Sequence, residues 1–377
     1  MDLRFTEEQQ LIRRSAREFA ESAVSPHVQE MEDDGKTPMD LVQEMAKMGL
    51  MGVCVPREFG GTELGNLART IMLEEIGRVS AASAFFLQIF HLGIDPIVTA
   101  GNDAQKKEYL PTLAKGERLA TCAVTESTGG SDPASLRMEA RRDGNDYILN
   151  GRKVFITNAH VADTVVVIAR TGEGSKGLSA FLVDKGMKGF RAGRHEHEFG
   201  LQGCNTGELV FEDCRVPASS LLGEEGQGLR IAFGSIGRLG RTGTAATALG
   251  ILNACLEDTV KHAKGRQLYG QPIAKLQAIQ WHISDIWLDL NIARQMCYRA
   301  SWLIDQGERC DAEAAAAKLY ATEAAVRSAK KAIDVYGGYG YLKEYAVQRY
   351  FRDSECLIAC AGTSEVMRIV IASTALA

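Results

Sequence analysis

Three long segments with the periodicity of amphipathic helices most constrain how this chain folds. They span residues 229–260, 273–305 and 312–335. The second has an apolar stripe at spacings of three and four residues, formed by Leu276, Ile279, Ile283, Ile286 and Leu290. Long helices joined by short links pack side by side as antiparallel bundles. The sequence therefore predicts a helical bundle over residues 227–377.

The remainder of the chain changes in character near residue 119. Before that point helical patterns recur, first at a capping-box pattern formed by Thr6 and Gln9 and then over residues 40–48, 67–79, 81–100 and 104–115. Residues 119–226 contain short strand patterns separated by turn signals, among them Asp143-Gly144 and Asn150-Gly151. We therefore expect an α+β protein, mainly α, with an N-terminal helical domain (1–118), a middle β-barrel or sandwich (119–226) and the C-terminal bundle.

The composition argues against several classes of protein. The 377 residues carry a net charge of −5, whereas a dedicated nucleic-acid binder usually has a basic surplus. The nine cysteines form no CxxC pair, which argues against a disulfide framework or a metal site and favours a reducing compartment, the cytoplasm. Residues 1–8 lack the apolar stretch of a secretory signal, and no apolar run approaches the roughly eighteen residues of a membrane span.

Two glycine-rich segments stand out. Residues 123–132 read Ala-Val-Thr-Glu-Ser-Thr-Gly-Gly-Ser-Asp and follow a predicted strand. Such loops present backbone N–H groups to an anion or to a polar ring edge. Residues 334–341, Asp-Val-Tyr-Gly-Gly-Tyr-Gly-Tyr, end a predicted helix. The second segment is not a P-loop, since no Gly-Lys-Ser/Thr follows, and it is not a Rossmann fingerprint, which follows a strand.

Together with residues 153–158, 266–270 and 360–365, these segments closely resemble the acyl-CoA dehydrogenase family of flavoenzymes, and the resemblance covers the whole chain. It implies the family architecture of N-terminal helices, a middle β-domain and a C-terminal four-helix bundle. It also implies FAD bound at a subunit interface, usually within a homotetramer. The implied substrate is an acyl-CoA thioester, and the implied electron acceptor is an electron-transfer flavoprotein.

The resemblance also assigns residues to the cofactor. Val124, Thr125 and Ser131 would border the isoalloxazine ring and the pantetheine of the substrate. Phe155, at a position where the family usually has Trp, and Thr157 would cover the flavin face. A second group would hold the pyrophosphate and adenosine of the neighbouring subunit's FAD, and it consists of Arg266, Tyr269, Gln277, Asp334, Gly337, Gly338, Thr363 and Glu365.

The residue that removes the α-proton in the ordinary family reaction is missing. The resemblance places that base at position 361, where this chain has Ala361 and family members carry Glu. A second family solution puts Glu before an Arg on an earlier helix, but Gly237 and Gly240 precede the two matching arginines. The backbone N–H of Ala361 would still polarise the thioester carbonyl. An unreplaced base would cost about 10²–10⁴-fold in rate.

The base could instead have moved along the pocket. In an α,β-unsaturated thioester the acidity extends to the γ-carbon, so a more distant base could drive a 1,4-elimination. The resemblance places the acyl pocket against one face of a helix, which carries Ala84, Gln88, His91, Leu92 and Asp95. His91 and Asp95 are its titratable residues, and we favour Asp95, which lacks a sequence-local partner. Family branches with a relocated Asp act on cyclic alkenoyl-CoAs, so we expect a substrate similar to cyclohex-1-ene-1-carboxyl-CoA.

Two alternatives to a relocated base are also open. The chain could expel sulfinate from a sulfinoacyl-CoA without net redox chemistry, with Arg238 or Arg241 anchoring the sulfinate. It could also be a flavoprotein that binds an acyl-CoA or an acyl-carrier protein without catalysis. Beside the missing base, Cys360 is expected to shape the acyl pocket rather than act as a nucleophile, because no His partner is evident. The three tryptophans are expected in the helical core.

Overall fold

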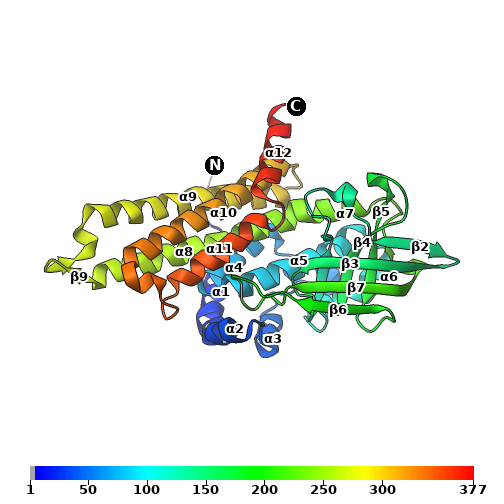
Figure 1. The fold of residues 1–377 in the computed structure, drawn as a ribbon, viewed down its shortest axis with the longest axis horizontal. Coiled ribbons are helices and arrows are strands. Elements are labelled where there is room, and N and C mark those ends of the chain that lie inside the picture. The colour runs from blue at the N-terminus through cyan, green and yellow to red at the C-terminus, as the bar shows by residue number, and fades with distance from the viewer. Residues whose placement is uncertain (1–4) are drawn as a thin grey trace.

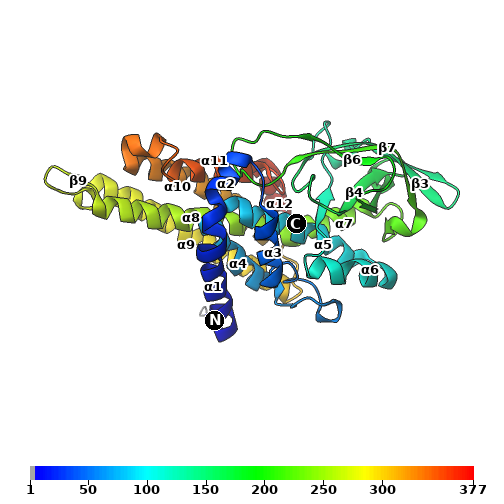
Figure 2. The same cartoon turned by 90° about the horizontal axis from the view of Figure 1, so that it is seen from below.

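The computed structural model describes residues 5–377. Residues 1–4, the first half of the stretch 1–8 in which no secretory signal is predicted, lie outside the described residues. The molecule is elongated, with a helical bundle at one end, a sheet at the other and the N-terminal helices beside their junction (Figure 1). A second view shows α1 (Glu7–Phe19) running across the long helices of the bundle (Figure 2). This is the mainly α, α+β architecture that the sequence predicts.

The helices that precede the sheet follow the predicted pattern closely. After α1 they are α2 (Val28–Asp34), α3 (Met39–Lys47), α4 (Gly65–Val79), α5 (Ala81–Ala100) and α6 (Asp103–Ala114). The capping box predicted at Thr6 is present, since the Gln9 N–H donates to the Thr6 hydroxyl and the Thr6 N–H donates to the Gln9 side chain. The Ser80 hydroxyl accepts from the Ser83 N–H and so caps α5 at its predicted start.

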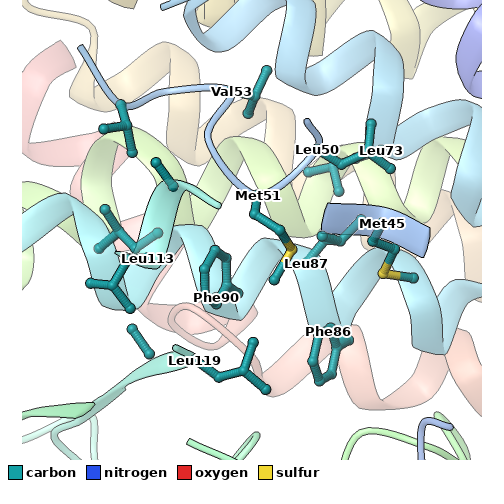
Figure 3. Packing of buried hydrophobic residues seen from close by; sticks show 14 of the residues in the cluster. Met45, Leu50, Met51, Val53, Leu73, Phe86, Leu87, Phe90, Leu113 and Leu119 are labelled. Atoms are coloured by element: carbon teal, nitrogen blue, oxygen red, sulfur yellow. The ribbon is translucent and has the colours of Figure 1, made fainter. Parts of the chain in front are cut away.

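Helix α5 is the central element of the N-terminal part. One of its faces packs into the core, where Phe86 and Phe90 lie near Met51 and Leu113 (Figure 3). Each such fully buried side chain contributes about 1.5–3 kcal/mol. The helix has the length and hydropathy of a membrane span, but 83% of that apolar stretch is buried inside the protein, as in a core helix. This packing fixes the direction of the other face, which carries the polar side chains.

The middle part is an eight-stranded sheet within residues 5–377. Its strands are β1 (Ala120–Ala123), β2 (Glu139–Asp143), β3 (Asp146–Ile156), β4 (Thr164–Arg170), β5 (Leu178–Asp184), β6 (Phe190–His195), β7 (Gly207–Pro217) and β8 (Leu221–Leu222). Their order is β6-β7-β3-β2-β4-β5-β8, with β1 paired to β4 in parallel. The hairpin predicted at Asp143-Gly144 joins β2 to β3. The sequence pattern does not indicate β6 or β8.

The turn predicted at Asn150-Gly151 is wrong, because β3 continues through both residues. Instead the pairing with β7 shifts between Leu149 and Gly151, which marks a β-bulge. Gly151 has φ +147°, and a Cβ there would lie 2.8 Å from the Cβ of Met138. Glycine is thus required for a close backbone approach within the sheet rather than for a reversal of the chain.

The C-terminal part contains the long helices of the bundle. They are α7 (Gly228–Ser235), α8 (Arg241–Gly265), α9 (Gln277–Asp305), α10 (Asp311–Tyr336), α11 (Val347–Ala359) and α12 (Ser364–Ala375). A short hairpin of β9 (Gln267–Leu268) and β10 (Gln271–Pro272) joins α8 to α9 at the far end of the bundle (Figure 1). The predicted segment 229–260 is helical throughout, but a π-helical turn at Ile236–Gly240, which the sequence does not indicate, divides it into α7 and α8.

The prediction that the tryptophans lie in the core is also wrong. The side chains of Trp281, Trp287 and Trp302 on α9 are 65%, 56% and 50% exposed. Their place on a periodic helix predicts burial, but the apolar stripe of α9 that packs inward carries Ile286 and Leu290 instead. Exposed Trp side chains on one long helix leave an apolar surface on the single chain.

Candidate active site

The polar face of α5 borders a small cleft. His91 and Asp95 lie one helical turn apart on this face, and both are buried. The cleft is lined by Met51, Cys54, Val55, His91, Ile94, Asp95, Val98 and Leu239. It is therefore an apolar space with one carboxyl group, walled by α5, the segment that follows α3, and the π-helical turn.

Asp95 is held by an arginine from the π-helical turn. The Arg238 Nη2 donates to the Asp95 Oδ2 at 2.5 Å, and the Asp95 residue is only 9% exposed. The Arg238 side chain is 41% exposed, so water also solvates its guanidinium. Among the side chains and backbone groups of residues 5–377, none donates to the Asp95 Oδ1. The arginine thus orients the carboxylate and leaves one oxygen free to accept.

His91 has both ring nitrogens engaged. Its Nδ1 accepts from the Arg69 Nε at 3.1 Å, and its Nε2 donates to the Leu50 carbonyl at 2.8 Å. Burial, reinforced by the Arg69 charge, lowers the pKa of His91 to about 3. The imidazole is therefore neutral, and its one lone pair is already used. This geometry argues against His91 as a base and favours a structural role, in which it ties α5 to the segment that lines the cleft.

Arg69 belongs to the residues that sequence reasoning missed. It is fully buried on α4, and its guanidinium also donates to the Asn66 side chain and to the Leu239 carbonyl. It forms no salt bridge with any described residue, so its positive charge is stabilised by hydrogen bonds to neutral acceptors alone. Burial lowers its pKa. The available signal was a charged residue among the apolar residues of the first half of α4, which indicates a buried bridging role.

Two of the positions that the resemblance implies for the base meet in space, Ala361 and Gly240, the second being one of the two glycines left open. Ala361 lies in the turn between α11 and α12, and a Cβ on Gly240 would lie 3.6 Å from the Ala361 Cβ. Ala361 has φ +54° and Gly362 has φ +105°, so this turn uses left-handed backbone. The Lys318 Nζ braces it by donating to the carbonyls of Ile358 and Gly362, at 2.7 and 2.8 Å. Neither position carries a carboxylate, and no local pattern in the sequence indicates the lysine brace.

The segments expected at the flavin ring lie side by side at the edge of the sheet where β1 and β3 end. The Val154 N–H donates to the Thr125 carbonyl at 3.0 Å, and the buried Lys153 ammonium donates to the Val124 carbonyl. Phe155 lies at a shift in the pairing of β3, has φ +57°, and is 65% exposed. A β-bulge re-aims a side chain in this way. A large exposed ring beside hydrogen-bonding backbone fits a flat aromatic group such as the isoalloxazine.

A buried ion pair supports this edge. The Lys153 Nζ lies 2.7 Å from the Glu126 Oε1, and both side chains are almost fully buried. Glu126 also accepts from the N–H groups of Arg137 and Met138. The pair therefore fixes the start of the glycine-rich loop against β3. Sequence reasoning missed both residues as positioning groups.

The residues expected to hold the pyrophosphate and adenosine are divided, because Thr363 and Glu365 directly follow the turn at Ala361 whereas the others lie elsewhere. The Arg266 guanidinium stacks over the Tyr339 ring, with 5.4 Å between its Cζ and the ring centroid, and Tyr269 at the tip of the β9–β10 hairpin is 89% exposed. This hairpin and the sheet are at opposite ends of the molecule (Figure 1). Within one chain, the hairpin that carries Tyr269 therefore lies far from the sheet. The arrangement fits a cofactor shared between two copies.

The other predicted residues are placed as follows. Gln88 is buried and donates to the Gly240 carbonyl, Leu92 is buried, and Arg241 donates to the Asp311 carbonyl. Thr363 caps α12. The exposed members of the predicted set are Ser131, Gln277, Asp334, Gly337, Gly338 and Glu365. Cys360 is partly exposed next to Ala361. No group of His, Cys, Asp and Glu within the described residues could hold a metal ion.

Comparison with known proteins assigns the family. Models of the N-terminal, middle and C-terminal domains of acyl-CoA dehydrogenase match residues 6–117, 121–214 and 226–376. An acyl-CoA dehydrogenase of Bacillus subtilis is 41% identical over 97% of both chains. A 3-(aryl)acrylate reductase of Clostridium sporogenes is 39% identical over 99% of both. Subunit CarC of the caffeyl-CoA reductase–Etf complex of Acetobacterium woodii is 36% identical over 97% of this chain and 98% of its own.

Solved structures agree with this assignment. Butyryl-CoA dehydrogenase from Megasphaera elsdenii superposes with a TM-score of 0.98 at 34% identity, over 100% of both chains. The FAD complex of PigA has a TM-score of 0.95 at 33% identity, over 99% of both chains, and it points to FAD as the cofactor. The fold and the site define an oxidoreductase that acts on the CH–CH group of an acyl thioester. The chain belongs to the acyl-CoA dehydrogenase family.

Proposed function

We propose that this enzyme dehydrogenates a cyclic or conjugated enoyl-CoA, of the cyclohex-1-ene-1-carboxyl-CoA type, by 1,4-elimination with Asp95 as the base. The observation that carries this proposal is Asp95 itself. It is the carboxyl group in the acyl cleft, one of its oxygens is held by Arg238, and the other accepts no hydrogen bond in the described structure. A general base needs a free acceptor in a fixed orientation.

In the proposed mechanism, this geometry gives Ala361, Asp95 and Arg238 different roles. The Ala361 N–H polarises the thioester carbonyl, which makes the γ-carbon of a conjugated thioester acidic. Asp95 takes that γ-proton at its Oδ1, while Arg238 keeps the carboxylate in place. FAD, when bound against the edge that carries Phe155, supplies the acceptor for the hydride. Because Ala361 and Gly240 carry no carboxylate, the α-proton of a saturated thioester meets no base at the usual place.

The lining of the cleft suits an apolar acyl group. Apart from His91 and Asp95 its lining consists of aliphatic and sulfur side chains. This lining favours a hydrocarbon acyl group over a polar one. A six-membered ring is short and holds its γ-carbon at a fixed distance from the carbonyl. That rigidity suits a base whose own position is fixed.

The wider setting of the reaction is also proposed. The separation of the two FAD-binding groups supports an assembly of several copies, which we take to be a homotetramer, and the exposed Trp287 and its neighbours on α9 give the apolar surface that it would cover. Electrons would pass to an electron-transfer flavoprotein, as the name of the CarC relative associates that protein with Etf. The free thiols suit the cytoplasm.

The alternative of a sulfinoacyl-CoA desulfinase is weakened by the same contact. Arg238 already has the Asp95 carboxylate as its counter-charge, so a sulfinate there would place a second anion beside Asp95, and one Arg241 donor is taken by the Asp311 carbonyl. An enzyme of that kind would form product without reducing the flavin. A flavoprotein that only binds thioesters would do neither.

The decisive experiment is anaerobic mixing of the FAD-loaded enzyme with saturated, cyclic-enoyl and sulfino acyl-CoAs, followed by flavin absorbance and product mass spectrometry. We expect bleaching with the cyclic enoyl-CoA only. Asp95→Asn should lower the bleaching rate by about 10²–10⁴-fold while ligand still perturbs the flavin spectrum. The matched control is Asp103→Asn on the surface of α6, which should react as the native enzyme does. Full turnover by Asp95→Asn would refute the assignment of the base.

A further inference from the structure

The end of α11 carries two thiols that face each other. Cys356 lies in its last turn and Cys360 directly follows the helix, and their Sγ atoms are 3.7 Å apart. Both residues are partly exposed. No other pair of cysteine sulfurs between residues 5 and 377 approaches within contact distance. The proposed reaction uses neither thiol.

The surroundings of these thiols favour reaction at Cys360. The Lys318 ammonium is fully buried nearby, forms no salt bridge with a described residue, and donates to the carbonyls of Ile358 and Gly362 on either side of Cys360. Hydrogen bonding from Cys356 and the Lys318 charge lower the pKa of Cys360. The thiols of the eight other cysteines have raised pKa values, mainly through burial or, for Cys356, through its contact with Cys360. The thiolate is the reactive form of cysteine.

We propose that Cys356 and Cys360 are an oxidisable dithiol that a peroxide converts to a disulfide, and that this bond switches off thioester polarisation at Ala361. The Cys360 thiolate attacks one oxygen of hydrogen peroxide, the O–O bond breaks, and the first water leaves once the second oxygen is protonated. The Cys356 thiol then attacks the resulting sulfenic sulfur, the S–O bond breaks, and the second water leaves. Two thiols lose two electrons, and the peroxide is reduced to two waters.

The effect on the site follows from the position of Cys360. A disulfide requires the two sulfur atoms to approach from 3.7 Å to about 2.05 Å, and we infer that this draws Cys360, which lies just outside the helix, toward Cys356. The next two residues, Ala361 and Gly362, form the left-handed turn that Lys318 braces. A pull on this turn redirects the Ala361 N–H away from the thioester carbonyl. This consequence for activity rests on the proposed function, whereas the formation of the disulfide does not.

The test treats the FAD-loaded enzyme with hydrogen peroxide and measures the intact mass, the linked peptide and the turnover. We expect the loss of two hydrogens per chain, a peptide linking Cys356 to Cys360, and turnover lower by about 10²-fold, the cost of losing one oxyanion donor. Dithiothreitol should restore both mass and turnover. Cys356→Ser should keep its basal turnover and form no disulfide, and the control Cys122→Ser should behave as the native enzyme does.

A second readout separates failure of this inference from failure of the proposed function. In the Asp95→Asn variant, an acyl-CoA titration followed by the flavin spectrum reports how the thioester is seated without any turnover. Oxidation should weaken that binding about tenfold, equivalent to the loss of one hydrogen bond to the carbonyl. Absence of the Cys356–Cys360 link after peroxide treatment would overturn the dithiol. A complete link with unchanged binding and turnover would overturn the switch.

Discussion

Replacement of Ala361 by Glu should give this enzyme the ordinary family reaction. Position 361 already tolerates a side chain at φ +54°, so Glu adds no left-handed strain beyond that of Ala. Its side chain would leave the turn beside Gly240, one of the two glycines that the resemblance offers as the position of the second family base. The thioester polarised by the Ala361 N–H would then have a carboxylate at its α-carbon.

The magnitude follows from what one positioned base contributes. A general base accelerates proton transfer by about 10²–10⁴-fold. The native chain has no base at this place, so the variant should dehydrogenate a saturated substrate such as cyclohexanecarboxyl-CoA at least about 10²-fold faster than the native enzyme. Asp95 is untouched, so reaction of the cyclic enoyl-CoA should persist alongside the new activity.

Anaerobic flavin bleaching by the saturated thioester measures this gain directly. Ala361→Gln is the matched control, because it has the same size and geometry without a basic carboxylate, and it should show no gain. If Ala361→Glu holds FAD and binds the saturated thioester but reacts no faster than Ala361→Gln, the α-carbon does not lie at this turn. The placement of the acyl group, and with it the role of Asp95, would then be wrong.

Two further predictions concern the buried groups around the site. His91 stays neutral in the folded chain because burial lowers its pKa from 6.5 to about 3. As the pH falls through 6.5, only the unfolded chain takes up a proton at this residue. The free energy of unfolding therefore decreases as the pH falls. Urea denaturation should show that the difference in free energy of unfolding between the native enzyme and His91→Gln narrows by about 2 kcal/mol from pH 7 to pH 5. A difference that stays constant with pH would contradict a neutral imidazole. Lys153→Met leaves the 6%-exposed Glu126 without its counter-charge and should cost about 3–5 kcal/mol in the same assay, whereas Lys153→Met with Glu126→Gln should recover part of this loss.

The extent of α5 can be predicted from sequence because its signals are local. The cap at Ser80 and an uninterrupted apolar pattern define its start and its length. The π-helical turn at Ile236–Gly240 cannot be predicted in this way, because glycines weaken α-helix formation and tertiary contacts then decide the local winding. The bulge at Gly151 resembles a turn in sequence because both use glycine with positive φ, and only the partner strand distinguishes them.

The candidate base can be narrowed from the sequence, but its partner cannot. Asp95 is one of two titratable residues on one helix face, and spacing alone identifies both. Its ion pair with Arg238 spans 143 residues of sequence, and the rotation of one helix against another decides it. The engagement of both nitrogens of His91 likewise depends on Leu50, which belongs to a different segment. Local spacing identifies candidates, and packing decides which of them is free to react.

The π-helical turn explains how a relocated base can stay coupled to the thioester site. Within Ile236–Gly240, Arg238 holds Asp95 at the cleft, and two residues later Gly240 lies against Ala361. One short segment therefore contacts both the group proposed to take the proton and the group proposed to polarise the carbonyl. Single-turn π-helical segments inside α-helices are frequent at functional sites. In the proposed mechanism, a base at Asp95 would thus keep a fixed position relative to the carbonyl, which a 1,4-elimination requires.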